Sequence, residues 1–207
     1  NRPWWQKFRQ GHFFMNKSDL RKKYKAKRAA LTESQVEVLD RQLLDYLKDL
    51  PWEEIQYLHC FLPIEKYKEY NTLPFLEWIG ENYPKMTLVI SKSDFQSHEL
   101  THYKYNAETL LKLNAWGIPE PEYGEEISVS LIDAIITPLL VVDQLGNRVG
   151  YGKGFYDRFF SACRPEVLKI GISYFAPIKE ISDVSEWDIP LSVVISPAGV
   201  FSVETPQ

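Results

Sequence analysis

Short apolar runs alternate with segments of helical period along most of this chain. The apolar runs, which predict strands, lie at residues 55–62, 87–90, 132–137, 168–172 and 193–195. Helical spacing of apolar residues occurs at residues 17–30, 36–50, 72–83, 107–113 and 155–163. Thr32 and Gln35 have the spacing of a capping box before the second of these helices. This alternation predicts a single-domain, three-layer α/β fold with a largely parallel central sheet flanked by helices.

Length and composition agree with one domain. The chain has 207 residues, of which 44% are hydrophobic and 25% are charged, an ordinary balance for a globular protein. Residues 15–207 are the expected domain, because Met15 precedes a helix that begins with a capping residue. Residues 1–14 are expected to be an N-terminal extension outside the fold, disordered or non-native.

Several classes of protein are disfavoured. The chain has no apolar stretch long enough to span a bilayer and no continuous apolar region of a secretory signal. Cys60 and Cys163 form neither a CxxC pair nor a disulfide framework, which predicts two buried thiols in a reducing compartment. The net charge of −4 argues against a general affinity for nucleic acid. We therefore expect a cytoplasmic monomer with neither a nucleic-acid nor a membrane partner.

A glycine-rich loop lies between a predicted strand and a predicted helix. Four glycines fall within nine positions, at Gly146, Gly150, Gly152 and Gly154. Glycine lets backbone amides approach an anion, and the following helix start adds its positive dipole end. The spacing matches neither a Walker A loop nor the dinucleotide fingerprint, and glycines alone would equally suit a plain turn. Because Arg148, Lys153 and Asp157 lie in the same loop, we favour a phosphate site with a carboxylate for Mg²⁺.

The same loop carries a family resemblance. Gly-Asn-Arg-Val-Gly-Tyr-Gly-Lys-Gly-Phe-Tyr-Asp-Arg, residues 146–158, resembles the signature loop of the 5-formyltetrahydrofolate cyclo-ligase family. Other segments are similar to those of the family in the same order, namely the basic helix start at 17–21, Phe61-Leu62 with 69–72, the stretch 116–121 and Asp188. Phe155 departs from the usual Tyr, and Ser192 stands where a second Asp is often found.

The resemblance implies an activity. It implies ATP-dependent closure of 5-formyltetrahydrofolate to 5,10-methenyltetrahydrofolate, with release of ADP and phosphate, through a phosphorylated formyl intermediate. The cofactors would be ATP and Mg²⁺, and the partner would be a reduced folate.

The resemblance also implies roles for individual residues. Three residues would be catalytic, Arg148, Lys153 and Tyr156, and two would hold the metal, Asp157 and Asp188. The ATP-binding residues would be Lys17, Ser18, Asp19, Leu20, Arg21, Arg148, Val149, Gly150, Tyr151, Gly152, Lys153, Gly154, Phe155 and Tyr156. The folate-binding residues would be Leu62, Glu69, Trp116, Tyr151, Gly152, Lys153, Gly154 and Phe155.

Three alternatives stay open at this point. A small-molecule kinase could use the same phosphate loop, the basic helix could belong to a nucleic-acid-binding module, and a degenerate family member could bind folate without turnover. Trp116 would equally suit a core position. His98 and His102 have the spacing of a metal pair, but their polar surroundings predict surface residues.

Overall fold

The computed structural model of the protein describes residues 15–203. The expected extension at residues 1–14 lies outside this range. Within the range, no helix has the length and apolar character needed to cross a membrane. The predicted α/β class with a largely parallel sheet is confirmed.

A seven-stranded sheet forms the middle layer, in the order β11-β10-β9-β6-β1-β2-β3. The strands are β1 (Tyr57–His59), β2 (Thr87–Asp94), β3 (Glu99–Tyr105), β6 (Ala134–Pro138), β9 (Leu168–Ile172), β10 (Val193–Ser196) and β11 (Gly199–Ser202). The inner pairs are parallel, whereas β3 and β11 run antiparallel at the two edges. Apolar side chains fill the inner strands because helices cover both faces.

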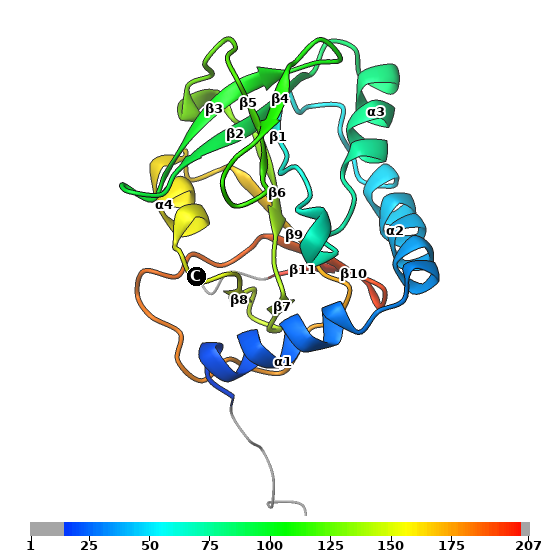
Figure 1. The fold of residues 1–207 in the computed structure, drawn as a ribbon, viewed down its shortest axis with the longest axis vertical. Coiled ribbons are helices and arrows are strands. Elements are labelled where there is room, and N and C mark those ends of the chain that lie inside the picture. Colours follow the sequence, from blue (N-terminus) through cyan, green and yellow to red (C-terminus); the bar gives the residue numbers. More distant parts are fainter. Residues whose placement is uncertain (1–14, 204–207) are drawn as a thin grey trace, which may run out of the picture.

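Helices lie on the two faces of this sheet (Figure 1). On one face α2 (Glu33–Lys48) and α3 (Leu73–Asn82) enclose a core that includes Leu58 and Ile136. On the other face α4 (Phe155–Ala162) covers a core that includes Val89 and Ile135. Adjacent strand residues therefore serve opposite cores, as the two-residue period of a strand requires.

The first helix packs against a smaller hairpin. The helix α1 (Lys17–Ala29) lies beside β7 (Val141–Val142) and β8 (Arg148–Val149), which pair antiparallel (Figure 1). Leu20 and Tyr24 bury its apolar stripe against these strands. The predicted start of α1 is confirmed and its end lies one residue earlier than predicted, at Ala29. The Thr32–Gln35 capping box of α2 is also confirmed. Local signals were sufficient for both helices.

Two predictions about the middle of the chain are wrong. The segment 107–113 is not a helix, because it contains β4 (Leu111–Leu113), which pairs with β5 (Pro119–Pro121). His102 is not a surface residue. It lies in β3 under α4, and only 6% of its surface is exposed. Within residues 15–203 the structure also has two 3₁₀ turns, η2 (Glu65–Tyr67) and η3 (Val129–Leu131).

The chain reverses its direction of travel across the sheet between β1 and β6. From β1 it moves outward to β2 and β3, whereas β9, β10 and β11 follow on the far side of β6. In open α/β sheets, ligands bind outside the carboxyl ends of the strands at such a switch point. The segments that follow β1 and β6 are therefore where a site is expected.

Candidate functional site

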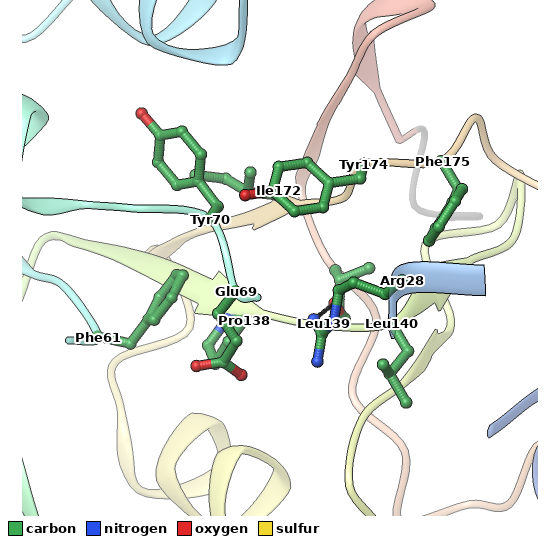
Figure 2. A pocket seen from close by; sticks show the side chains of 10 residues that line it. All are labelled: Arg28, Phe61, Glu69, Tyr70, Pro138, Leu139, Leu140, Ile172, Tyr174 and Phe175. Atoms are coloured by element: carbon green, nitrogen blue, oxygen red, sulfur yellow. Dashed lines mark hydrogen bonds between the residues drawn. The ribbon is translucent and has the colours of Figure 1, made fainter. Parts of the chain in front are cut away.

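A pocket opens at this switch point (Figure 2). It is lined from the segments after β1, β6 and β9 and from the end of α1, by Arg28, Phe61, Glu69, Tyr70, Pro138, Leu139, Leu140, Ile172, Tyr174 and Phe175. Thr72, at the start of α3, donates its hydroxyl to the Phe61 carbonyl at 2.7 Å and so fixes the segment that carries Glu69.

The glycine-rich loop runs from β8 to α4 beside this pocket. Gly152 and Gly154 have φ values of +86° and +73°, the left-handed region that favours glycine. Arg21 of α1 donates from Nε to the Gly150 carbonyl at 3.0 Å. A Cβ atom on Gly152 would lie 3.1 Å from the Arg21 guanidinium carbon. The glycines thus allow the basic helix and the loop backbone to approach each other.

A cation at the start of α1 contacts the loop between β9 and β10. Lys17 pairs with Asp188, and its backbone amide donates to the Asp183 carboxylate at 2.7 Å. The Ser185 amide also donates to Asp188, at 2.6 Å. Burial raises the pKa of Asp188, but the hydrogen bonds from Lys17 and Ser185 bring it below its ordinary value. Asp188 is therefore held as an anion.

A second ion pair lies at the start of α4. Arg148 donates from Nη2 to Asp157 Oδ1 at 2.7 Å and from Nη1 to the Ile189 carbonyl at 2.6 Å. The amide of Ile189, the residue that follows Asp188 in the chain, donates to Asp157 at 3.3 Å. The guanidinium also lies 4.5 Å from the centre of the Phe160 ring. The two predicted metal ligands are thus brought together, each beside a cation.

This pair of carboxylates is an incomplete metal site by itself. Within residues 15–203, no group of three or more His, Cys, Asp or Glu side chains is arranged to hold a metal ion. Mg²⁺, however, commonly takes one or two carboxylates and completes its shell with water and substrate phosphates. The oxygen donors of Asp157 and Asp188 fit that mode of binding.

Glu69 is a buried carboxylate, 6% exposed. Its Oε1 accepts from the Tyr151 hydroxyl at 2.8 Å, and its Oε2 accepts from the Ile64 amide at 2.8 Å. Burial raises the pKa of Glu69, while the Ile64 amide, the charge of Arg28 and the Tyr151 hydroxyl act in the opposite direction. The carboxylate is therefore aimed by two donors inside the pocket.

Arg28 belongs to the site although the motifs did not single it out. It lies 5% exposed in the last turn of α1 and donates to the Tyr151 hydroxyl. Since a helix turns about 100° per residue, eleven residues place Arg28 about 20° from Lys17 around the axis. The sequence could therefore have indicated that Arg28 belongs to the site, because Lys17, Arg21 and Arg28 share one helix face with the buried Tyr24.

Other predicted site residues lie on the surface or in the core. Lys153, Ser18 and Asp19 are exposed, while Leu20 and Leu62 are buried in hydrophobic clusters. Their side chains therefore occupy quite different surroundings.

Aromatic rings connect the glycine-rich loop to the neighbouring hairpins. Phe155 meets the edge of Phe95 at 5.3 Å, and Phe95 stacks on Trp116 at 5.2 Å. Trp116 is 52% exposed, so its alternative assignment to the core is wrong. The Tyr156 ring lies 6.2 Å from His59, on the α4 side of the sheet.

Known proteins are similar to this chain in sequence and in architecture. The model of the 5-formyltetrahydrofolate cyclo-ligase family matches residues 14–197. The 5-formyltetrahydrofolate cyclo-ligase of Escherichia coli K12 is 28% identical over 179 residues, which cover 84% of this chain and 97% of that protein. The protein of the same name from Haemophilus influenzae is 33% identical over 100 residues, covering 47% of this chain and 54% of its own.

A solved structure agrees with these matches. The 5,10-methenyltetrahydrofolate synthetase of Aquifex aeolicus has a TM-score of 0.77 to this fold at 29% identity, covering 92% of this chain and 94% of its own. The family match spans most of the described residues, including the pocket, the glycine-rich loop and both ion pairs. The chain therefore belongs to the 5-formyltetrahydrofolate cyclo-ligase family, a family of ligases.

Proposed function

We propose that this protein closes 5-formyltetrahydrofolate to 5,10-methenyltetrahydrofolate at the expense of ATP. One observation carries the proposal, namely that the glycine-rich loop lies between the cations of α1 and the buried Glu69 carboxylate. The phosphate groups of ATP need cations, and a flat heterocycle with donor groups needs an acceptor such as a carboxylate. The reaction requires the two sites to lie side by side. The curated relatives bear the name of this activity.

The chemistry explains the need for ATP. The formyl group on N5 is amide-like, so attack by N10 has to expel its oxygen. Transfer of the γ-phosphoryl group to that oxygen breaks the bond to ADP and creates a phosphate leaving group. N10 then bonds to the formyl carbon and loses its proton, phosphate departs, and the methenyl bridge remains. Such transfers depend on positioning and charge neutralisation more than on covalent chemistry.

The cations and the loop would serve the phosphates. Lys17 and Arg21 would bind ATP from α1, with the backbone amides of the glycine-rich loop around the transferring group. Arg148 and the exposed Lys153 would neutralise that group, and Tyr156 would hydrogen-bond near it. Asp157 and Asp188 would hold Mg²⁺, which supplies further charge neutralisation on the phosphate oxygens.

The pocket after β1 would serve the folate. A pterin presents a ring N–H and an amino group, both donors, to which a carboxylate offers two acceptor oxygens. Glu69 is the buried carboxylate of this pocket and is already aligned by two donors. The loop side chains Tyr151 and Phe155 would form the neighbouring wall, together with Leu62 and Trp116.

The test is product analysis with the purified protein. Incubation with 5-formyltetrahydrofolate, ATP and Mg²⁺ should generate the ultraviolet absorption of the methenyl product together with stoichiometric phosphate. A kinase would leave a stable phosphorylated product without that absorption, and a degenerate member would bind folate without turnover. Either result in folded protein would refute the proposed reaction.

A further inference from the structure

Arg28 differs from the other basic residues of α1. Lys22, Lys23, Lys25 and Lys27 are exposed, whereas Arg28 is buried at the end of the helix. A buried guanidinium is costly unless its donors find partners, so its contacts indicate what retains it there. Figure 2 shows its side chain reaching from the end of α1 toward the side of the pocket where Glu69 lies.

The hydrogen bonds of Arg28 give the Tyr151 hydroxyl a direction. Arg28 donates from Nη2 to this hydroxyl and from Nη1 to the Leu139 carbonyl at 3.4 Å. Because a guanidinium has only donors, the Tyr151 oxygen must accept from it. The hydroxyl proton is then left for Glu69 Oε1, 2.8 Å away. Arg28, Tyr151 and Glu69 thus form a chain in which every donor points toward the carboxylate.

We propose that Arg28 is a positioning residue for folate recognition, which acts through Tyr151 to align the Glu69 carboxylate. The proposal rests on the proposed function and goes beyond it in assigning a residue that does not itself contact the reacting atoms. Since Tyr151 occupies one oxygen of Glu69, the chain also sets how much of the carboxylate faces the incoming pterin.

The position of Arg28 also joins the two halves of the site. Arg21 bonds the carbonyl of Gly150, and Arg28 bonds the side chain of the next residue, Tyr151. Both arginines come from one rigid helix, two turns apart. The helix that carries the cations proposed to bind phosphate therefore also holds Glu69, through Tyr151. In this way α1 would set the distance between the two substrates.

The electrostatic surroundings of Glu69 make the proposal measurable. From α1 the facing cation is Arg28. The facing groups from the glycine-rich loop and from α4 are the neutral hydroxyls of Tyr151 and Tyr156. Tyr70 and Tyr174 are the other titratable side chains that line the pocket. Burial raises the pKa of Glu69, and Arg28 is the cation that opposes this effect. Removing that charge should raise the pKa of Glu69 further.

The experiment compares Arg28→Gln with wild type by equilibrium titration with 5-formyltetrahydrofolate and, separately, with ATP, between pH 5 and pH 8. Loss of a charged hydrogen bond should weaken folate binding roughly ten- to hundredfold and leave the Kd for ATP unchanged. Folate binding requires the ionised carboxylate, so it declines as the pH falls through the pKa of Glu69. With that pKa raised, the decline should begin at a higher pH in Arg28→Gln.

Two further variants separate positioning from mere packing. Lys22→Gln removes an exposed cation from the same helix and should leave both affinities and the pH profile unchanged. Arg28→Lys keeps the charge without the planar fork, so it should keep the wild-type pH profile while recovering only part of the affinity. It also serves if Arg28→Gln fails to fold.

The outcomes distinguish this inference from the proposed function. Wild-type folate affinity and pH profile in folded Arg28→Gln or Arg28→Lys would overturn the role of Arg28 alone. An equal loss of folate and ATP affinity would also overturn it, because a collapse of α1 would affect both sites. Wild-type protein that binds no 5-formyltetrahydrofolate would instead refute the proposed function together with this inference.

Discussion

Two buried histidines should make this protein sensitive to mild acid. His59 of β1 and His102 of β3 are bridged by Ser91, whose hydroxyl lies 2.7 Å from His59 Nε2 and 3.0 Å from His102 Nδ1. Phe159 of α4 packs over both rings, at 4.8 Å and 4.1 Å. Burial lowers the pKa of His59 below its ordinary value, and burial lowers that of His102 to about 4. Both rings are therefore neutral in the folded protein near neutral pH.

The free energy follows from linkage. The pKa of His102 is 6.5 when unperturbed and about 4 in the folded state, so below pH 6.5 the unfolded chain binds the proton more readily. The stability that the neutral His102 ring contributes is fully present above pH 6.5 and is lost as the pH falls toward 4. Between pH 7 and pH 5, His102 alone should remove about 2 kcal/mol, and His59 acts in the same direction. Typical domains have a total stability of only about 5–15 kcal/mol.

The measurement is the free energy of unfolding in urea at pH 7 and pH 5, for wild type and His102→Asn. The asparagine has no proton to gain in this range, so its loss between the two pH values should be about 2 kcal/mol smaller than that of wild type. His98→Asn is the matched control, because it removes a histidine from the β2–β3 turn and keeps both buried rings. An equal acid loss in wild type and His102→Asn would refute the reasoning.

Three further predictions concern the phosphate site. Gly152→Val should weaken ATP binding about tenfold or more in an ATP titration, because φ is +86° and the new Cβ would meet Arg21 at 3.1 Å. Lys153→Ala should lower kcat about a hundred- to thousandfold with an unchanged Tm, and near-normal kcat at saturating ATP would leave its role to Arg148. Excess chelator should abolish turnover with ATP, and full turnover there would disprove a metal at Asp157 and Asp188.

Much of the candidate site was predictable because its parts are short and contiguous. The loop at residues 150–154 needs glycine for reasons visible in a few residues, and two of its glycines do have positive φ. Lys17 and Arg21 lie one helical turn apart, and both contact the segments expected to bind phosphate or metal. Whether Glu69 and Asp157 bind folate and Mg²⁺ stays a prediction.

Other features depended on partners far away in the chain. The segment 107–113 has leucines at helical spacing, but pairing with β5 makes part of it a strand whose leucines are exposed. His102 looked like a surface residue because its sequence neighbours are polar, and only the packing of α4 buries it. These errors share one cause, since burial and strand pairing are decided by contacts that local pattern does not contain.

The sequence by itself determined the α/β class, the capped helices α1 and α2 and the glycine-rich loop, because capping, period and backbone freedom act within a few residues. The tertiary structure alone decided which polar groups meet. The Glu69–Tyr151 bond joins residues 82 positions apart, and the Arg28–Tyr151 bond joins residues 123 apart. Burying Arg28 and Glu69 is tolerable only once the fold has brought those distant donors and acceptors together, because an unpartnered charge in the interior is too costly to retain.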